Sequence, residues 1–291
     1  MPLDPEKLLA FDIPKGRQTL SPRDVALYAL SIGMGRDPVD EDELTFIDVN
    51  RPMKIVPSMA FVLAHPGFWF ANPATSLDAS GVLHADQSLE LLAPIAVDAT
   101  VASSTRIVDL IDKGPGKAAL MRTETMLRDD RGQALARLLR TVYLRGAGGF
   151  GGKSEQAPPA TAAPDGPPDH VVDLATRPDQ ALLYRLNGDL NPLHADPAFA
   201  KKAGFERPIL HGLCTAGIVC RALLQAVLGY DDAALHRFHV RFAGVVLPGE
   251  TIRTEIWNSG HFRAIAVERD AVVIDNGHFT LKGAGPVSGP E

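Results

Sequence analysis

The second half of the chain combines one long apolar segment with several alternating segments. Residues 212–228 are apolar at nearly every position, and Gly229, a residue type that often ends helices, follows them. This pattern predicts a helix that is buried nearly all round. Apolar and polar residues alternate in 250–257, 262–269 and 272–282, which is typical of strands.

The first half repeats this order of patterns. Strands are expected at 99–110, 117–128 and 135–144. The counterpart of the long helix is predicted at 57–69, because Pro57 suits the first position of a helix. Repeated antiparallel strands after one long helix predict an α+β fold with a sheet wrapped around each helix.

Two short polar segments are expected to connect neighbouring strands. Residues 129–132 read Asp-Asp-Arg-Gly, and residues 275–277 read Asp-Asn-Gly. Asn-Gly in particular is a strong hairpin signal. We therefore predict tight turns at both places.

The halves also resemble each other in detail. Ser21 and Thr176 each open a similar segment and are candidate helix N-caps. Residues 84–95 resemble residues 238–249, and both segments look like a strand that ends at a proline turn. The chain therefore looks like a diverged duplication.

A segment rich in Gly and Pro separates the halves. Eleven of the 24 residues in 146–169 are Gly or Pro, a composition typical of a linker. We predict an N-terminal domain at 1–147, a linker at 148–169 and a C-terminal domain at 170–291.

Composition and charge narrow the class of protein. With 45% hydrophobic and 22% charged residues, the chain is that of an ordinary globular protein. A net charge of -6 argues against nucleic-acid and anionic-membrane binders, since both need a basic face. Residues 212–228 are too short, and with Arg221 too charged, to predict a membrane span. Neither end of the sequence carries a secretory or peroxisomal signal, so the cytoplasm is the expected compartment.

The two cysteines are expected to be buried thiols. Cys214 and Cys220 are six positions apart in one predicted helix, where a disulfide is geometrically implausible. Buried thiols fit a reducing compartment. A nucleophilic Cys214 near the helix N-terminus is the alternative.

The chemistry concentrates in residues 184–194, which read Tyr-Arg-Leu-Asn-Gly-Asp-Leu-Asn-Pro-Leu-His. Gly, Asn and Pro favour an irregular loop. This loop carries Asp189 and His194; an aspartate is normally ionised at pH 7, and a histidine can gain or lose a proton near that pH. Both on one short loop would suit the activation of a water molecule.

This segment resembles the signature of the hydratase 2 family, the (R)-specific enoyl-CoA hydratases of the MaoC-like dehydratases. The shared positions are Tyr184, the run Gly-Asp-Leu-Asn-Pro-Leu-His at 188–194, and Ala200. Residues 207–212 match the start of the family's central helix. The resemblance implies a double hot-dog fold, with one hot-dog in each half.

The resemblance also implies a reaction, the hydration of a trans-2-enoyl thioester of coenzyme A. Asp189 and His194 would hold a water and move protons, and Asn191 would orient them. The backbone N–H of Gly212, at a helix N-terminus, would stabilise the thioester oxygen. Which of the Asp and His is base and which is acid stays open, because a close pair titrates jointly. Coenzyme A is part of the substrate, and no further cofactor is expected.

Several nearby residues are candidates for substrate contact. Basic side chains could meet the phosphates of coenzyme A or simply lie in solvent. The histidine before the predicted helix could instead cap it or pack near its start. The candidates are Tyr184, Lys201, Lys202, Arg207 and His211.

A metal site formed by Asp189, His194 and His211 is not expected, because their spacing matches no zinc pattern. The first half lacks the corresponding chemistry. In the alignment of the halves, Gly33 stands opposite the Asp and Pro38 opposite the His. We therefore expect one active site per chain, in the second half, and a homodimer of the whole chain.

Three other interpretations stay open. The chain could be a dehydratase for a branched or sterol-type acyl thioester, a noncatalytic thioester-binding subunit, or a thioesterase. Fold alone does not choose among them. Retention of Asp189, Asn191, His194 and Gly212 together favours a hydratase.

Overall fold

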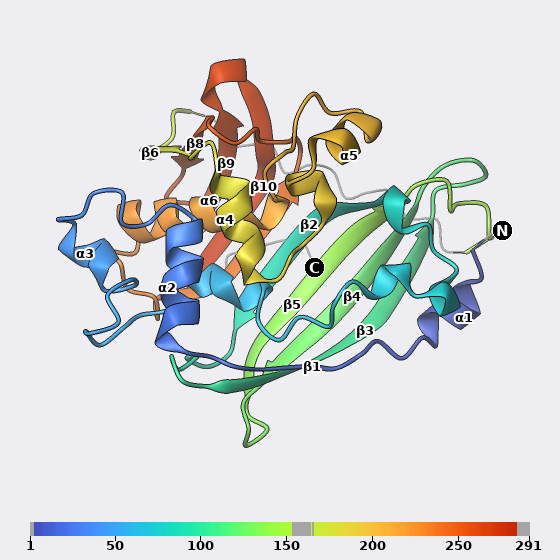
Figure 1. Cartoon of the computed structure of the whole chain (residues 1–291), viewed down its shortest axis with the longest axis horizontal. Coiled ribbons are helices and arrows are strands. Elements are labelled where there is room, and N and C mark those ends of the chain that lie inside the picture. The colour runs from blue at the N-terminus through green and yellow to red at the C-terminus, as the bar shows by residue number, and fades with distance from the viewer. Residues whose placement is uncertain (1–2, 153–163, 165, 284–291) are drawn as a thin grey trace. The chain divides into compact units, whose positions relative to one another are not determined.

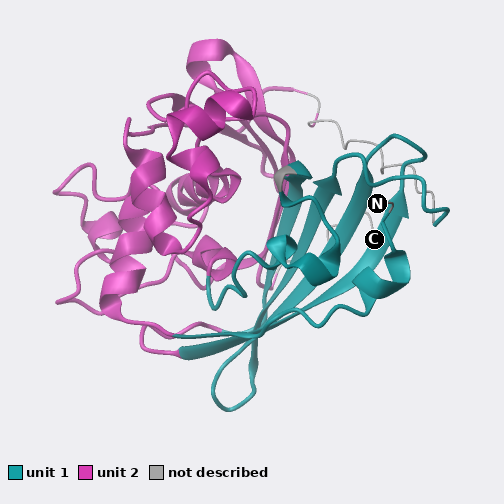
Figure 2. Ribbon diagram, turned by 45° about the vertical axis from the view of Figure 1, so that its right-hand side comes forward, with its two compact units in different colours: residues 1–18, 63–93, 100–161 teal, residues 19–62, 94–99, 162–291 magenta. Residues whose placement is uncertain are grey.

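The computed structural model describes residues 3–152, 164 and 166–283 of the chain (Figure 1). The chain forms two compact units (Figure 2). Unit 1 contains residues 1–18, 63–93 and 100–161, and unit 2 contains residues 19–62, 94–99 and 162–291. The units do not follow chain order, because residues 19–62 belong to the unit that also contains the second half.

Unit 1 is built on a five-stranded sheet. Its strands are hydrogen-bonded in the order β1-β3-β4-β5-β2, and the pairs from β3 to β2 are antiparallel. The strands are β1 (Gly16–Thr19), β2 (Val82–Leu91), β3 (Thr100–Asp112), β4 (Ala119–Arg128) and β5 (Ala134–Leu144).

Only short helices accompany this sheet in the described part of unit 1. Helix α1 (Pro5–Leu9) contacts β3, and Leu8, Trp69 and Met121 belong to one buried cluster. The remaining helices are single 3₁₀ turns: η2 (Trp69–Ala71), η3 (Pro73–Thr75) and η4 (Ala79–Gly81).

Unit 2 has an antiparallel sheet and a long central helix. Its strands follow the order β7-β10-β9-β8-β6. They are β6 (His170–Ala175), β7 (Leu235–Phe242), β8 (Thr251–Ile256), β9 (His261–Ala266) and β10 (Ala271–Leu281). Helix α6 (Gly212–Ala226) is buried from Cys214 to Leu224, which confirms the predicted central helix. None of the helices in the described ranges is both long and apolar enough to span a bilayer.

The other helices of unit 2 are short. They are α2 (Pro22–Ser31), α3 (Glu41–Leu44), η1 (Pro57–Phe61), α4 (Gln180–Tyr184), η5 (Arg185–Asn187), η6 (Pro192–His194), α5 (Pro197–Lys202) and η7 (Val267–Arg269). Helix α2 lies beside α4 (Figure 1). The segment after α2 packs directly on α6, because a Cβ added at Gly217 would lie 2.6 Å from Ile32 Cγ2.

The predicted N-caps had different outcomes. Ser21 is confirmed: its hydroxyl and the Asp24 carboxylate form a reciprocal capping box at the start of α2. Thr176 is not an N-cap, and Asp179 occupies that position before α4. The Thr176 hydroxyl is engaged elsewhere, since it donates to the Glu250 carbonyl at 2.7 Å.

The six strands predicted at 99–110, 117–128, 135–144, 250–257, 262–269 and 272–282 are confirmed to within three residues at each end. Strands also form in 84–95 and 238–249, but β2 and β7 end at Leu91 and Phe242, before the expected proline turns. The predicted helix at 57–69 is wrong, because the chain forms only the five-residue η1 there before η2 begins. Ala64 has a left-handed φ of 48°, and Pro66, which lacks an N–H and disfavours helical backbone in the residue before it, prevents a helix from continuing to residue 69.

The turn at 129–132 is confirmed, but the turn at 275–277 is wrong. Residues 275–277 lie inside β10, where its pairing with β7 and β9 shifts register. Asn276 has a φ of 51°, and a Cβ on Gly277 would lie 2.3 Å from the Phe262 ring. The Asn-Gly pair therefore forms a β-bulge, which uses the same left-handed backbone as a hairpin turn.

The predicted linker falls partly on residues 153–163 and 165, which lie outside the described residues. At its start, the N–H groups of Gly149 and Gly151 each donate to the Asp112 carboxylate at 2.7 Å. The domain boundaries at 1–147, 148–169 and 170–291 stay a prediction.

Candidate active site

The loop that carries the chemical motif is irregular, as its Gly, Asn and Pro predict. Gly188 ends η5 with a φ of 113°, a left-handed backbone that glycine adopts easily. Asp189 Oδ1 accepts from the N–H of Asn191 at 3.1 Å. Asn191 Oδ1 in turn accepts from the N–H of Leu193 at 3.0 Å and caps η6. Two consecutive side-chain turns thus fix the path from Asp189 to His194.

His194 ends η6 and is buried, with 8% of its surface exposed. Its Nδ1 lies 2.8 Å from the carbonyl oxygen of Ile209. A carbonyl only accepts, so Nδ1 carries the hydrogen, and Nε2 holds the lone pair when the ring is neutral. Burial lowers the pKa of His194, which favours this neutral form.

His211 precedes α6 and packs against His194. The two rings stack with centres 3.7 Å apart, and only 1% of His211 is exposed. Its Nε2 lies 3.2 Å from the carbonyl oxygen of Asp189, so this nitrogen donates. Burial and the neighbouring His194 lower the pKa of His211. A neutral His211 therefore ties the Asp189 backbone to the start of α6.

The side chains of Asp189, His194 and His211 come together. Each offers an oxygen or nitrogen atom, and these atoms all lie within 4.8 Å of one another. Asp189 is exposed whereas both histidines are buried. A carboxylate open to solvent and a buried imidazole thus border the same small volume, where one small molecule can contact both.

The same cluster has the donor types of a metal site, but its ring geometry does not suit one. Lone pairs of imidazoles lie in the ring plane, and the planes of His194 and His211 are only 27° apart. Because the two rings are stacked, an ion in the plane of one ring lies outside the plane of the other. A shared zinc would need a lone pair from each ring at roughly 2.0–2.1 Å.

Gly212 is the first residue of α6, and no side chain caps this helix. The first N–H groups of a helix have no partner within the helix and carry partial positive charge. A Cβ at this position would lie 3.2 Å from the Phe242 ring, a tight contact, so glycine leaves the most room beside this backbone. The helix start therefore combines available donors with close access to its backbone.

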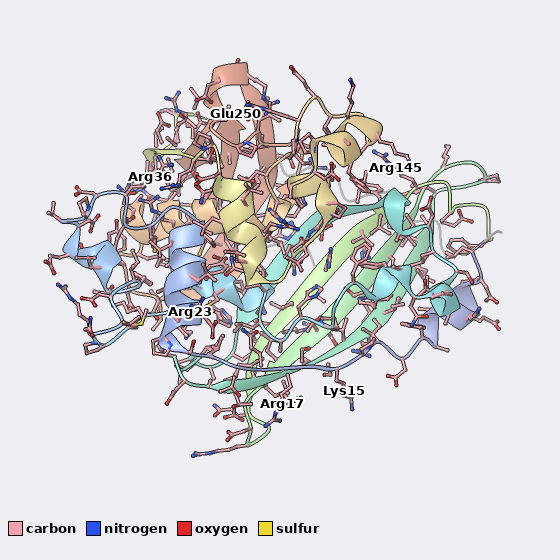
Figure 3. The ribbon with its side chains drawn as sticks, in the orientation of Figure 1. Lys15, Arg17, Arg23, Arg36, Arg145 and Glu250 are labelled. Atoms are coloured by element: carbon pink, nitrogen blue, oxygen red, sulfur yellow. The ribbon has the colours of Figure 1, made fainter. Side chains whose placement is uncertain are left out.

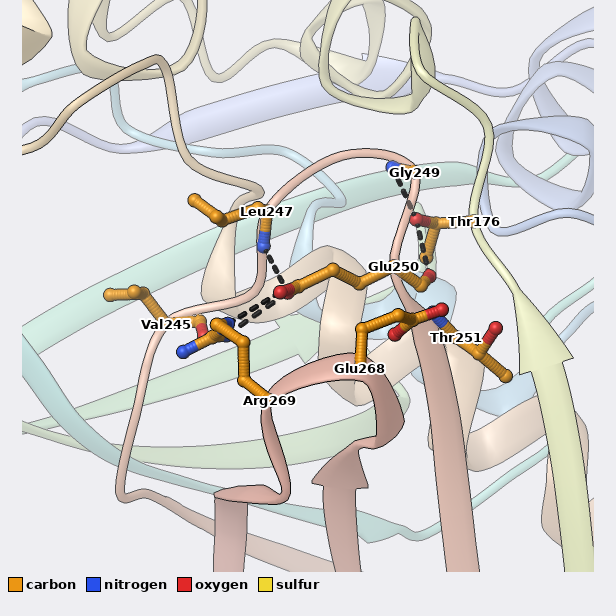
Figure 4. A network of polar contacts seen from close by, with 8 residues as sticks. All are labelled: Thr176, Val245, Leu247, Gly249, Glu250, Thr251, Glu268 and Arg269. Carbon is orange, nitrogen blue, oxygen red and sulfur yellow. Dashed lines mark hydrogen bonds and ion pairs between the residues drawn. The ribbon is translucent and has the colours of Figure 1, made fainter.

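The loop between β7 and β8 supports this helix start. Val246 accepts from the N–H of Leu210 at 2.8 Å. Glu250, labelled in Figure 3, directly precedes β8 and holds this loop. Its carboxylate accepts from the N–H of Leu247 at 2.7 Å and forms an ion pair with Arg269 (Figure 4). Burial alone would raise the pKa of Glu250, but the hydrogen bonds from Arg269 and Leu247 outweigh burial and lower it. Glu250 is therefore an ionised anchor behind the site.

The remaining candidates lie in different environments. Tyr184 is buried beside His211, with ring centres 5.0 Å apart, and burial raises the pKa of its hydroxyl. Lys201 and Lys202 end α5, and with Arg207 they are exposed. The structure thus places Tyr184 beside His211, and substrate contact by the three basic residues stays a prediction.

Sequence reasoning missed the carbonyl of Ile209, which sets the tautomer of His194. A backbone group carries no signal in the residue type, so only the proximity of 209–212 to the motif pointed to it. It also missed the contact of the motif loop with Ser31, whose hydroxyl accepts from Asn187 Nδ2 at 2.8 Å. Ser31 lies in unit 2 although it comes from the first half of the sequence.

Comparison with known proteins identifies the two halves. Residues 19–146 match the MFE-2 hydratase 2 N-terminal domain family, and residues 159–279 match the MaoC like domain family. The chain is 39% identical over 286 residues to the enoyl-CoA hydratase ChsH3 of Mycobacterium tuberculosis, covering 95% of this chain and 98% of that protein. It is 40% identical over 269 residues to the peroxisomal enoyl-CoA hydratase 2 of Arabidopsis thaliana, covering 87% and 86%.

Solved structures confirm the predicted fold. The crystal structure of a MaoC-like dehydratase from Phytophthora capsici superposes with a TM-score of 0.83 at 33% identity, covering 97% of this chain and 100% of that one. A Mycobacterium tuberculosis protein with a double hot-dog fold superposes with a TM-score of 0.59 at 18% identity, covering 93% and 94%. The chain therefore has the double hot-dog fold, is a hydro-lyase, and belongs to the hydratase 2 family of MaoC-like dehydratases.

Proposed function

We propose that the chain catalyses the reversible syn addition of water to trans-2-enoyl-CoA, which yields (3R)-3-hydroxyacyl-CoA. The observation that carries the proposal is the convergence of Asp189 and His194 within 4.8 Å, next to the uncapped start of α6. The similar proteins named as enoyl-CoA hydratases support the substrate class. Coenzyme A is then part of the substrate, and the proposed chemistry needs no additional cofactor.

Water is bound first in this scheme. The Asp189 carboxylate and the His194 Nε2 lone pair each accept one hydrogen of the water, whose oxygen then points at Cβ of the enoyl group. Because His194 has a lowered pKa and donates through Nδ1, its Nε2 is ready to accept at neutral pH. Positioned acid–base groups of this kind typically contribute ~10²–10⁴-fold in rate.

The next step forms the C–O bond and moves one proton within the site. The water oxygen bonds to Cβ, the Cα–Cβ π electrons move toward the thioester carbonyl, and the water loses one proton to the Asp-His pair. That proton is returned to Cα of the enolate. Because one pair serves both steps from one side, hydrogen and hydroxyl add to the same face.

The enolate oxygen needs a donor while the negative charge is present. The N–H of Gly212 supplies it in this scheme, assisted by the positive end of α6. Loss of one such donor typically costs on the order of 10²–10³-fold in turnover. Asn191 holds the turn between the Asp and the His, since its side chain caps η6.

The proposal includes one active site per chain, because the first half lacks proton-transfer side chains at the two corresponding positions. Gly33 ends the α2 segment with a φ of 90°, and neither it nor Pro38 has a side chain that can move a proton. We propose that the whole chain forms a homodimer. The cytoplasmic location stays a prediction.

The test is a spectroscopic hydration assay on crotonyl-CoA and on a longer straight-chain enoyl-CoA, with chiral analysis of the product. The expected product is the 3R alcohol in both cases. Fast turnover of branched or sterol-type substrates alone would favour the alternative dehydratase. Free thiol release from a saturated acyl-CoA would indicate a thioesterase, and binding without turnover a noncatalytic subunit.

A further inference from the structure

Ser31 is a buried polar hub at the end of α2. It has no exposed surface, and its hydroxyl donates to the carbonyl of Tyr28 at 2.7 Å. It comes from the first half of the sequence but lies in unit 2 with the motif loop (Figure 2). In Figure 3, the labelled Arg23 lies in the first turn of α2, and the labelled Arg36 follows the end of that helix.

Three side chains from the second half donate to this one residue. Asn187 Nδ2 donates to the Ser31 hydroxyl at 2.8 Å, and Gln180 Nε2 donates to the Ser31 carbonyl. Cys214 Sγ on α6 lies 3.6 Å from the same carbonyl. Ser31 therefore connects α2 to the helix before the motif loop, to the loop itself and to the central helix.

The contact with Asn187 acts closest to the chemistry. Asn187 is two residues before Asp189, and only Gly188, with its left-handed backbone, separates them. The same Asn187 Nδ2 also donates to the carbonyl of Tyr184 at 2.8 Å, so its side chain is held from two sides. Because only this one residue links them, the fixed position of Asn187 sets where the backbone of Asp189 begins.

The far side of Asp189 is fixed independently. His211 donates to the Asp189 carbonyl at 3.2 Å. The backbone of Asp189 is thus held at one end through Asn187 and Ser31, and at the other by His211. Loss of either contact loosens the Asp189 backbone, and the carboxylate, which the N–H of Asn191 still holds at 3.1 Å, moves with that backbone relative to His194.

We infer that Ser31 is a positioning residue for the proposed reaction, and that its hydroxyl directs the Asp189 carboxylate by fixing Asn187. The inference rests on the proposed function, because its main readout is hydration. It gives a residue from the first half of the sequence a role in holding the active-site loop. Misplacement of a catalytic group by about 1 Å can cost on the order of 10²-fold in rate.

The experiment compares Ser31→Ala, Asn187→Ala and the double variant with the wild-type protein in the hydration assay. Each single variant should lower kcat about 10–100-fold with KM nearly unchanged, since neither residue contacts the substrate in the proposed scheme. The loss in the double variant should be much smaller than the product of the two single losses, because both substitutions remove the same Ser31–Asn187 hydrogen bond.

Ser58→Ala is the matched control. Ser58 is also a fully buried serine of unit 2, and it accepts from the Tyr28 hydroxyl at 2.9 Å rather than from the motif loop. It should lose stability as Ser31→Ala does but keep kcat within about twofold. If Ser31→Ala does not fold, Asn187→Ala still tests the contact from the less buried side.

A second readout does not require activity. Hydrogen exchange of the amides at 188–191 should become at least tenfold faster in Ser31→Ala, while the α6 amides keep their protection. Wild-type hydration combined with unchanged kcat and exchange in Ser31→Ala would overturn the inference and leave the proposed function intact. Failure of the wild-type protein to hydrate any enoyl-CoA would instead remove the proposed function.

Discussion

The rings of His194 and His211 stack with centres 3.7 Å apart, and each ring uses one nitrogen for a main-chain carbonyl. Two imidazolium ions at this separation would repel each other, and burial penalises each charge further. The pKa of both histidines is accordingly lowered. Burial and stacking therefore favour the neutral pair, with Nε2 of His194 as its unprotonated nitrogen.

Removing either proton-transfer group should abolish most hydration. Asp189→Asn and His194→Gln keep the size of each side chain but lose its ability to exchange a proton, so kcat/KM should fall about 10²–10⁴-fold. Steady-state kinetics on crotonyl-CoA measures the loss, and thermal unfolding checks that the protein stays folded. Near-wild-type turnover in either variant would refute the assignment.

The lowered pKa of His194 makes a prediction about the pH dependence of kcat/KM. The neutral ring is the reactive form, and it persists below the ordinary histidine pKa of about 6.5. The acid limb of the profile should therefore lie below pH 6.5 and report the joint titration of the active-site groups. An acid limb above that pH would show that the buried histidine is not held neutral.

The same shifts predict a stability effect. In the unfolded chain both histidines take up a proton below about pH 6.5, whereas in the folded protein they resist protonation. Stability is therefore fully present above pH 6.5 and is lost as the pH falls toward the folded-state values. The loss per group is at most about 1.4 kcal/mol per pH unit. Urea unfolding at pH 7.5 and 5.5 should show a smaller difference for His211→Phe than for the wild-type protein.

Gly212→Ala should reduce turnover through its neighbour Phe242. The added methyl group would lie 3.2 Å from the aromatic ring, so either the ring or the start of α6 must shift by a few tenths of an ångström, and a shift of α6 moves the proposed oxyanion donor. We expect kcat to fall about 10–100-fold, less than for complete loss of the donor. The double variant Gly212→Ala/Phe242→Leu provides room and should recover part of the loss. No recovery would indicate that the methyl group blocks the substrate itself.

Much of unit 2 could be predicted from the sequence because its signals are local. Alternation located β8, β9 and β10, and continuous apolar character located α6. The misassignments are also local in origin. The Asn-Gly pair at 276–277 favours left-handed backbone, and a bulge inside β10 contains such backbone just as a hairpin turn does. In the first half, η1 ends at Phe61, and the left-handed Ala64 and then Pro66 keep a helix from continuing to residue 69.

The geometry of the site depends on contacts that spacing does not encode. Asp189 and His194 share one loop, so their proximity follows from the motif. His211 is 17 positions beyond His194, and their stacking arises only when α6 docks in the sheet. Ser31 is more than 150 positions from Asn187, and the residue types of neither predict that the pair would meet.

The membership of α2 in unit 2 predicts that the second half does not fold well alone. A fragment of residues 170–291 would lack Ile32, which packs against α6 at Gly217, and Glu43, which forms a buried ion pair with Arg221. Breaking a buried pair by removing one partner typically costs about 3–5 kcal/mol, a large share of the stability of a small domain. We expect the fragment to show no cooperative transition in thermal unfolding followed by near-ultraviolet circular dichroism. A chain that joins residues 19–62 to the fragment should regain the transition. Cooperative unfolding of the fragment on its own would show instead that the halves are independent domains, as the linker composition suggests.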